Sequence, residues 1–436
     1  MPRRRQHPPL LVLLNNHLVG RLSKEAGGAV HFQYDQTWLA RDQGIPVSLS
    51  LPLREEAYRG ESVIAVFDNL LPDSDLLRRR IAEKVGAAGT DAYNLLAKIG
   101  RDCVGALQFI PDGIDLPKAS AKITGEIIDD LEIENLLKNL SRVPLGLDQD
   151  QDFRISIAGA QEKTALLHYK GKWRKPHGAT PATHILKTQI GKLQNGLDLS
   201  NSVENEFYCL KLLAGFGLPV ASAAIKTFGQ TTALVIDRFD RQWIKPGHLI
   251  RVPQEDMCQA LGCAPSRKYQ NQGGPGIKEI LELLDAAASP AEDQKLFLKA
   301  QILFWLIGAT DGHAKNFSIF LGEGGNFRLA PLYDVLTAQP SCDSRQVERK
   351  LMMLAMSVGD SRHYQIDSIE PRHFIQSANR AGVVVSIADQ ALREIQQAAD
   401  DALDTISKTL PPEIPRKIHE SVSRALKTRL KKFPKR

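Results

Sequence analysis

Cysteine is scarce in this sequence, and the cysteines present form no metal-binding or redox motif. The 436 residues include five cysteines, with no CxxC pair and no histidine-containing zinc spacing. They are Cys103, Cys209, Cys258, Cys263 and Cys342. This pattern predicts reduced thiols in a cytoplasmic protein.

An apolar run of membrane-spanning length and a strong net charge are missing as well. No stretch is long and apolar enough to span a membrane, so we expect no membrane partner. The formal net charge is +6, from 56 basic and 50 acidic residues, so local basic clusters matter more than the total. The apolar part of "MPRRRQHPPLLVLLNN" is short, and no cleavage site of small residues follows it. We interpret it as a first strand that turns at Asn15 and Asn16, rather than as a signal peptide.

The composition that is present is ordinary for a globular protein, and it is arranged in three successive regions. Hydrophobic residues make up 43% and charged residues 24%, and the length is enough for two or three domains. Short apolar segments alternate with turns near the start, followed by a helix with Pro72 in its first turn. We predict an α+β region with a connector over 1–150, a β-rich core over 151–245 and a helical region over 246–436.

The middle region begins with a segment that has the pattern of a hairpin. In "FRISIAGAQEKTALLHY", two apolar arms flank a small polar centre, so residues 158–161 should form the tip. Side chains alternate along a strand, so Ile155 and Ile157 would share the core face and Ser156 would face away. A further strand, "ATHILKT", carries Lys187 near its end.

Two helices carry capping signals at their N-termini. Asn201 precedes "SVENEFYCLKLLAGFGLP" and could cap that helix together with Glu204. Ser289, Pro290 and Glu292 likewise predict a capping box at the start of a long apolar helix, "SPAEDQKLFLKAQILFWLIGAT".

That long helix ends in a cluster of polar residues, "GATDGHAKNFS". Asn316 follows Asp311 by five residues, a Gly-rich hairpin comes next, and Asp334 stands where its second strand ends. Phosphoryl transfer needs such a set. One carboxylate orients or deprotonates the attacking hydroxyl, while an amide oxygen and a second carboxylate hold Mg²⁺ on the phosphates. Polar residues that only cap a helix end would explain Asp311 alone, but not all three in this order.

Lys187 fits the ATP-binding part of the same chemistry. It can reach phosphate groups from the strand end, although a surface lysine at a strand end is the more common explanation when this residue is taken alone. Glu204 and Glu206 are two apart on the next helix, so at most one of them can pair with Lys187. The tip "IAGAQEKT" can offer backbone N–H groups to phosphates. It is not a Walker A loop, because Glu162 stands where the second glycine should be, and it lacks the three glycines of the usual kinase loop.

Several stretches together resemble the HipA family, the serine/threonine-kinase toxins of bacterial type II toxin–antitoxin pairs. They are "RISIAGAQEKTALL", "HILK", "SVENEF", "QEDMCQALG", "GGPGI", "WLIGATDGHAKNFS" and "PLYDV". The resemblance runs over nearly the whole chain, including "FDNLLPD" near the N-terminus. It implies an α+β, bilobal protein-kinase-like fold with an N-terminal α+β subdomain and a mainly helical C-terminal lobe.

The resemblance also implies a role for each matching residue. Asp311 would be the catalytic aspartate, Asn316 and Asp334 would bind Mg²⁺, Lys187 would contact the ATP phosphates, and autophosphorylation of Ser156 would switch the kinase off. The further ATP contacts implied in the phosphate loop, hinge and catalytic loop are Ile157, Ala158, Gly159, Ala160, Gln161, Glu162, Lys163, Thr164, Asp237, Arg238, Phe239, His313, Lys315 and Asn316.

The function that the resemblance implies is transfer of the γ-phosphoryl group of ATP to a protein serine or threonine. The family's target is glutamyl-tRNA synthetase, whose phosphorylation arrests translation. The implied partners are a HipB-like helix-turn-helix antitoxin and operator DNA, on which the toxin acts as corepressor. Two other functions stay open: a small-molecule kinase of the aminoglycoside-kinase type, which uses a similar D-x-x-x-x-N loop, and a non-catalytic DNA-binding corepressor.

Three further features each have two interpretations. The basic tail "RKIHESVSRALKTRLKKFPKR" predicts an amphipathic helix that is either solvated or in contact with DNA phosphates. His313 either braces the catalytic loop or only packs there. Gln254, Glu255 and Asp256 either contact the substrate or form a helix N-terminus with favourable dipole placement.

Overall fold

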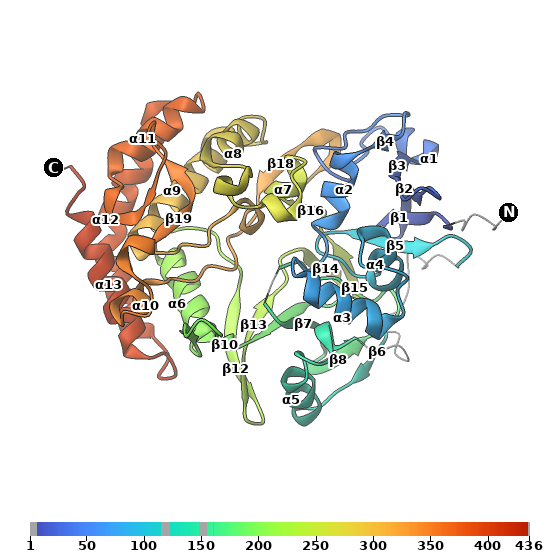
Figure 1. Ribbon diagram of the computed structural model, residues 1–436, viewed down its shortest axis with the longest axis horizontal. Coiled ribbons are helices and arrows are strands. Elements are labelled where there is room, and N and C mark those ends of the chain that lie inside the picture. Colours follow the sequence, from blue (N-terminus) through green and yellow to red (C-terminus); the bar gives the residue numbers. More distant parts are fainter. Residues whose placement is uncertain (1–6, 115–122, 148–154, 160, 435–436) are drawn as a thin grey trace. The chain divides into compact units, whose positions relative to one another are not determined.

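The chain folds into two compact units. The computed structural model describes all residues except 1–6, 115–122, 148–154, 160 and 435–436 (Figure 1). Unit 1 comprises Met1–Thr188, Lys226–Ser266 and Phe320–Asn326, and unit 2 comprises Gln189–Ile225, Arg267–Ile319 and Phe327–Arg436. Each unit therefore combines segments that are distant in sequence. Residues 189–225 lie in unit 2 and residues 246–266 in unit 1, which differs from the three consecutive regions expected above.

The first sheet of unit 1 is antiparallel, with the order β4-β3-β2-β1-β5. Its strands are β1 (Leu10–Leu14), β2 (His17–Lys24), β3 (Val30–Tyr34), β4 (Tyr58–Arg59) and β5 (Leu107–Pro111). The predicted first strand is confirmed, and Asn15 and Asn16 turn it into β2 with φ of 47° and 68°. Two central residues with positive φ match the right-handed twist of a hairpin.

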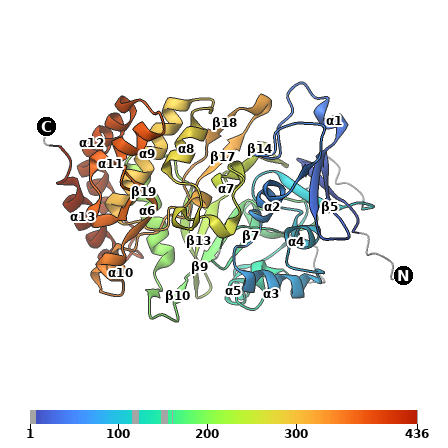
Figure 2. The same cartoon turned by 45° about the horizontal axis from the view of Figure 1, so that its top comes forward.

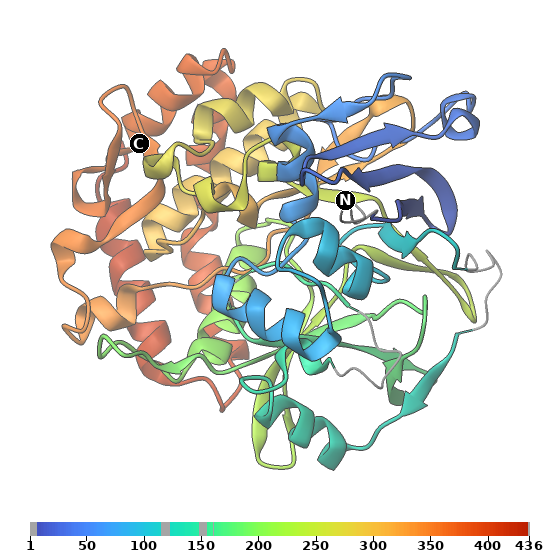
Figure 3. The same cartoon turned by 45° about the vertical axis from the view of Figure 1, so that its right-hand side comes forward.

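Helices cover this first sheet and complete a core with it (Figure 3). Phe67 packs its ring against Phe32 and Phe109, with ring centroids 5.6 and 5.5 Å away. The helices of this part are α1 (Gln36–Leu39), α2 (Glu61–Asp68), α3 (Asp75–Val85) and α4 (Ala92–Ile99). Helix α3 begins after Ser74, whose side chain accepts the N–H of Leu77. The expectation that Pro72 belongs to its first turn is therefore wrong.

The second sheet of unit 1 contains the order β13-β9-β7-β8-β6. Its strands are β6 (Gly125–Ile127), β7 (Lys163–Tyr169), β8 (Lys172–Pro176), β9 (His184–Thr188) and β13 (Thr231–Asp237). The other elements of this part are α5 (Asp130–Lys138), the hairpin β14 (Arg241–Lys245) and β15 (His248–Arg251), β16 (Gln254–Asp256) and α7 (Met257–Ala260). β12 (Ala223–Phe228) leads into β13. Residues 155–158 form no strand, so the expected hairpin with β7 is wrong. Part of its first arm, residues 153–154, lies outside the described residues.

Unit 2 is built around a buried helix, α9 (Pro290–Ile307) (Figure 2). Lys299 on α9 forms an ion pair of 2.8 Å with Glu394 on α12, so a buried ammonium group has its partner. The other helices are α6 (Ser202–Gly215), α8 (Ile277–Leu284), α10 (Gln339–Asp343), α11 (Pro371–Arg380), α12 (Val385–Thr409) and α13 (Arg416–Leu430). The strands are β10 (Gly191–Lys192), β11 (Asp198–Leu199), β18 (Phe327–Leu329), β19 (Met353–Val358) and β20 (His363–Gln365). β17 (Ser318–Leu321) begins in unit 2 and ends in unit 1.

The helix starts of α6 and α9 are near the predicted positions, but the predicted caps are wrong. Neither Asn201 nor Ser289 makes a side-chain capping bond. Gln189 caps α6 instead, because its Oε1 accepts the N–H of Val203 at 2.9 Å. Its Nε2 donates to both carboxylate oxygens of Glu204, at 3.0 and 2.8 Å. Glu204 is thus committed to Gln189.

The basic tail forms α13, which uses several of its cations inside unit 2. Its apolar face, which includes Val422 and Leu426, is buried. Arg424 forms a 2.6 Å ion pair with Asp343, and Arg429 donates to the carbonyl of Leu306 at 2.8 Å. Part of the positive charge of the tail therefore serves packing.

Within the described part of the chain, none of the helices combines the length and the apolar character needed to cross a bilayer.

Candidate active site

The predicted catalytic loop follows the end of α9 directly. Gly308 ends the helix in the left-handed conformation, with φ of 72°, which glycine adopts without strain. The loop then turns back on itself, because the carbonyl of Asp311 accepts the N–H of His313 at 2.9 Å and Nδ2 of Asn316 at 2.8 Å. Asp311 and Asn316, five residues apart, are therefore joined in one turn.

His313 lies between these two residues and is almost completely buried. Burial lowers the pKa of His313, while the nearby carboxylates of Asp311 and Asp334 act to raise it. Both acidic residues of the predicted set therefore contribute to the electrostatic environment of the ring. Its Nδ1 has no hydrogen-bond partner among the described residues. The interpretation that His313 packs in the loop is confirmed, and its role in bracing the loop stays a prediction.

The segment that carries Asp334 is tied to the same loop. Tyr333 donates its hydroxyl to the carbonyl of Lys315 at 2.9 Å and lies 2.6 Å from the hydroxyl of Ser318. Asp334 itself has φ of 58°, in the left-handed region. A non-glycine residue held there costs on the order of 1 kcal/mol, and such strain is concentrated at functional sites.

Helix α6 fixes the far side of the Asp334 segment. The buried side chain of Asn205 bonds both backbone groups of Thr337, at 2.9 Å each. The hydroxyl of Thr337 donates to the carbonyl of Ile307, at the end of α9, at 2.6 Å. Asp311 and Asp334 are therefore attached to the same buried helix end.

The donor set of this loop fits Mg²⁺. The amide nitrogen of Asn316 is committed to the carbonyl of Asp311, so its Oδ1 points the opposite way. That oxygen and the carboxylate of Asp334 are hard oxygen ligands. Two protein ligands suffice for Mg²⁺ when substrate phosphates and water supply the others.

Unit 1 holds the residues predicted to contact phosphates. Lys163 on β7 and Lys187 on β9 are directly opposite in the antiparallel register, so their side chains share one face of the sheet. Both are buried. Lys163 donates to the carbonyl of Ala158 at 2.8 Å, and a β-carbon at Gly159 would lie 2.6 Å from its Nζ. Lys163 therefore shapes the loop, while Lys187 lies beside it.

The rest of the predicted phosphate loop is partly structural. The hydroxyl of Thr164 is buried and donates to the carbonyl of Leu145 at 2.8 Å. Gln161 donates to the carbonyl of Thr188 at 2.8 Å. Ile157 is buried, as predicted, and Glu162 is half-buried. Ala160 lies outside the described residues.

Ser156 is completely buried, so the expectation that it faces away from the core is wrong. Its hydroxyl donates to the carbonyl of Leu70 at 2.7 Å, and its N–H donates to the carbonyl of Asp102 at 3.0 Å. Nearby, Gly159 forms an isolated parallel bridge with Pro72. The start of the loop thus rests on the "FDNLLPD" segment of the N-terminal region.

The predicted hinge residues lie at the end of β13. Asp237 accepts a 2.8 Å hydrogen bond from His184 on β9, and burial lowers the pKa of that histidine to about 4, so the ring is neutral. The ring of Phe239 meets Phe320 edge to face, with centroids 5.7 Å apart. Arg238 turns into the interior, where both its Nε and Nη2 donate to Asp240 at 3.0 and 2.8 Å. A contact between its side chain and ATP is therefore unsupported.

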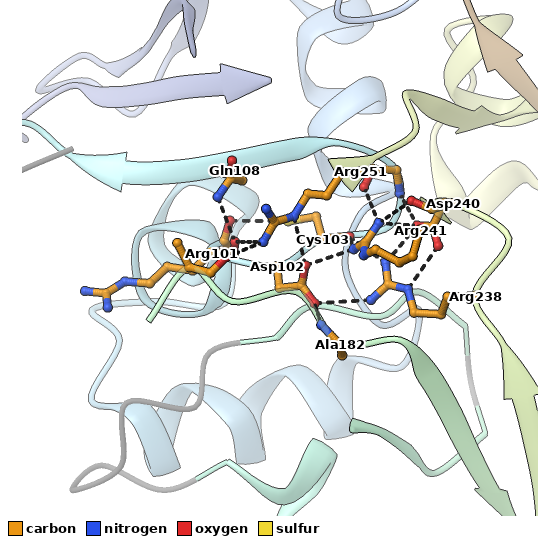
Figure 4. Close-up of polar contacts among 12 residues, drawn as sticks. Arg101, Asp102, Cys103, Gln108, Ala182, Arg238, Asp240, Arg241 and Arg251 are labelled. Atoms are coloured by element: carbon orange, nitrogen blue, oxygen red, sulfur yellow. Dashed lines mark hydrogen bonds and ion pairs between the residues drawn. The ribbon is translucent and has the colours of Figure 1, made fainter. Parts of the chain in front are cut away.

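Arg238 belongs to a buried charge cluster that sequence reasoning missed (Figure 4). The carboxylate of Asp102 accepts bonds from Arg241 at 2.8 Å, Arg251 at 3.0 Å and Arg238 at 3.3 Å. Burial alone would raise the pKa of Asp102, but the three guanidinium groups hold it below its ordinary value. The cluster joins the "GRDCVG" turn of the N-terminal region to the predicted hinge residue Arg238.

The "PQEDMCQALG" segment is structural. Asp256 caps α7, because its side chain accepts the N–H of Gln259 at 2.9 Å. Glu255 is buried and accepts the N–H of Leu49 at 2.8 Å. Burial raises the pKa of Glu255 to about 8. The helix-start interpretation is confirmed for Asp256, and Gln254 and Glu255 are buried beside it.

One more residue of the catalytic region was not predicted. Tyr269 donates its hydroxyl to Oδ1 of Asp311, with 2.5 Å between the oxygens. Its ring lies edge to face with His313 at a centroid distance of 4.9 Å. The only sequence signal was the Gly-rich "GGPGI" stretch that follows it.

Comparison with known proteins agrees with this geometry. The model of the HipA N-terminal domain matches residues 10–110, and the model of the HipA-like C-terminal domain matches residues 155–403. "Putative kinase Y4mE" of Sinorhizobium fredii is 31% identical over 403 residues, which cover 91% of this chain and 94% of that protein. "Serine/threonine-protein kinase toxin HipA" of Shewanella oneidensis is 28% identical over 416 residues, which cover 92% and 89%.

A solved structure shows the same fold. The Shewanella oneidensis HipA structure, determined with HipB and its operator DNA, matches with a TM-score of 0.79 at 24% identity and covers 97% of both chains. The expected kinase-like α+β fold and the resemblance stated from the sequence are both confirmed. The chain belongs to the HipA family of kinases.

Proposed function

We propose that this protein is the ATP- and Mg²⁺-dependent serine/threonine kinase toxin of a HipA–HipB type pair, acting in the cytoplasm. Asp311 accepts the proton of the attacking hydroxyl, and Asn316 and Asp334 hold the metal. Bound Mg²⁺ neutralises the charge that develops on the phosphates. Lys187 contacts the phosphates, and the backbone around Asp237 meets the adenine.

The observation that carries this proposal is the joint position of the catalytic set. Asn316 is bonded to Asp311, and Tyr333, the neighbour of Asp334, is bonded to Lys315 in the same loop. Thr337 ties the Asp334 segment to the end of α9. A loop that only capped a helix would not need a strained aspartate on a separate segment. The two buried lysines on one face of the unit 1 sheet provide the positive charge that triphosphate binding requires.

The partners are proposed from the relatives. A HipB-like antitoxin and operator DNA are supported by the assembly named for the Shewanella oneidensis protein. The exposed cations of α13 that packing does not use, such as Lys417 and Lys427, are available to DNA phosphates. The protein substrate we propose is glutamyl-tRNA synthetase, and Ser156 is the self-phosphorylated residue.

Incubation with γ-labelled ATP and Mg²⁺ tests the proposal. The expected result is label on the protein itself, at Ser156, and on added glutamyl-tRNA synthetase. Label transferred only to aminoglycosides would favour a small-molecule kinase. No transfer at all, with intact binding of antitoxin and DNA, would favour a non-catalytic corepressor.

A further inference from the structure

Tyr269 brings a phenol hydroxyl to the carboxylate that we assign as the proton acceptor. The bond from this hydroxyl to Oδ1 of Asp311 connects residues 42 positions apart, both within unit 2. Hydrogen bonds from a hydroxyl to an ionised carboxylate are short and strong. The contact therefore fixes one of the two oxygens of Asp311.

The backbone that carries Tyr269 is itself firmly held. The carbonyl of Tyr269 accepts the N–H of Gly274 at 3.0 Å, and the carbonyl of Lys268 accepts the N–H of Ala314, in the catalytic loop, at 3.4 Å. A β-carbon at Gly274 would lie 1.8 Å from the carbonyl oxygen of Arg267, so this turn requires glycine. The turn is closed tightly and is bonded to the loop that it serves.

Asp311 needs such a partner because its side chain lies at the surface of unit 2. An exposed carboxylate without a fixed partner samples several rotamers. The edge-to-face contact of Tyr269 with the buried ring of His313 fixes the direction of the phenol. The hydroxyl then holds Asp311 in one orientation.

We propose that Tyr269 is a positioning residue for phosphoryl transfer. Its hydroxyl anchors Oδ1 of Asp311 and thereby directs Oδ2 to the hydroxyl of the protein substrate. The inference rests on the proposed function, because it takes Asp311 as the proton acceptor. A hydroxyl that only occupied the place of the substrate would have to leave at every turnover, and the closed turn that carries Tyr269 argues against this.

The test is the steady-state kinetics of Tyr269→Phe. Phenylalanine keeps the ring against His313 and removes only the hydroxyl. We expect kcat to fall about 10- to 100-fold, as a misplaced reacting group causes, while the KM for ATP stays within about twofold. Tyr364→Phe is the matched control, because Tyr364 donates to Gln270, the neighbour of Tyr269, at 3.4 Å. It removes the same group without touching Asp311, and its kcat should not change.

A double-mutant cycle separates positioning from general damage. In an Asp311→Asn background, Tyr269→Phe should add little, because its effect acts through that carboxylate. A kcat equal to or above that of the parent protein, or a full additional loss in the Asp311→Asn background, would overturn the inference. Failure of the parent protein to transfer phosphate would overturn the proposed function together with the inference. An active parent with an equally active Tyr269→Phe variant would overturn the inference alone.

Discussion

Replacing Asp102 by asparagine should destabilise unit 1 strongly, because it removes a negative charge from the buried cluster of Asp102, Asp240 and three arginines. The cluster holds three guanidinium groups, of Arg238, Arg241 and Arg251, against the carboxylates of Asp102 and Asp240. Its formal charge is therefore +1, and Asp102→Asn raises it to +2. Breaking a buried ion pair on one side typically costs about 3–5 kcal/mol. This is a large share of an ordinary domain stability of about 5–15 kcal/mol.

The assay is urea unfolding followed by circular dichroism, with a charge-balanced control. Asp102→Asn/Arg251→Met returns the formal charge of the cluster to +1. We expect the double variant to be more stable than the sum of the single effects predicts, by about 1–3 kcal/mol. A loss below about 1 kcal/mol for Asp102→Asn, or additive effects, would refute the reasoning.

The same cluster predicts a dependence of stability on pH. Although burial acts to raise it, the pKa of Asp240 is lowered from 3.8 to about 2 by Arg238 and Arg241. A lowered folded-state pKa stabilises the protein above the unfolded-state pKa, near 3.8, and this contribution is lost as the pH falls towards 2. Asp240→Asn should therefore flatten the acid limb of the unfolding free energy measured between these pH values, and an unchanged limb would contradict the assignment.

Three further predictions concern the site and its surroundings. Phosphorylation of Ser156 should weaken ATP binding at least about 100-fold, because a buried phosphate replaces the donor to Leu70 and must leave the core. Ser156→Ala should weaken ATP binding less than about tenfold, since only one hydrogen bond is lost. Equal affinities of the phosphorylated and unphosphorylated proteins for a fluorescent ATP analogue would exclude displacement of the phosphate loop by the phosphate. Asp334→Asn should weaken Mg²⁺·ATP binding more than Lys187→Ala, because the metal is the larger local charge, and titrations with and without Mg²⁺ decide this. Glu255 has a folded-state pKa of about 8 against 4.5, so stability should fall as the pH rises between these values; Glu255→Gln should remove that fall in urea unfolding, and parallel pH curves would contradict it.

The sequence predicted best what depends on local spacing. Asp311 and Asn316 lie within nine residues after the end of α9. A polar cluster after an apolar helix was therefore enough to find them. The first strand and its turn at Asn15 and Asn16 were likewise local, because two residues of one type determine that turn.

Contacts between segments that are distant in the chain could not be predicted from the sequence. Gln189, and not Asn201, caps α6, because its side chain accepts the N–H of Val203 in the first turn of the helix. Asp102 lies 136 residues from Arg238, and nothing in "GRDCVG" indicates that an isolated aspartate collects three arginines. The position of Tyr269 at Asp311 needs the folded turn in the same way.

The phosphate loop shows a different limit. Alternation of apolar residues around Ser156 predicted a strand, but residues 155–158 form none. Their backbone bonds instead to the N-terminal region, at Asp102, and the Ser156 hydroxyl bonds to Leu70. The apolar residues around Ser156 are buried without belonging to a strand. Their spacing in the sequence alone does not distinguish this arrangement from a strand in a sheet.

The most direct test of the account is transfer of label from γ-labelled ATP by the parent protein and by Asp311→Asn, with equal ATP binding verified for both. Asparagine keeps the shape of the side chain and an acceptor for Tyr269, but it cannot take the proton of the attacking hydroxyl. The account predicts Mg²⁺-dependent labelling of the parent protein and a loss of at least about 100-fold in the variant. Equal labelling of the two proteins, or no labelling of a parent protein that binds Mg²⁺·ATP, would contradict it.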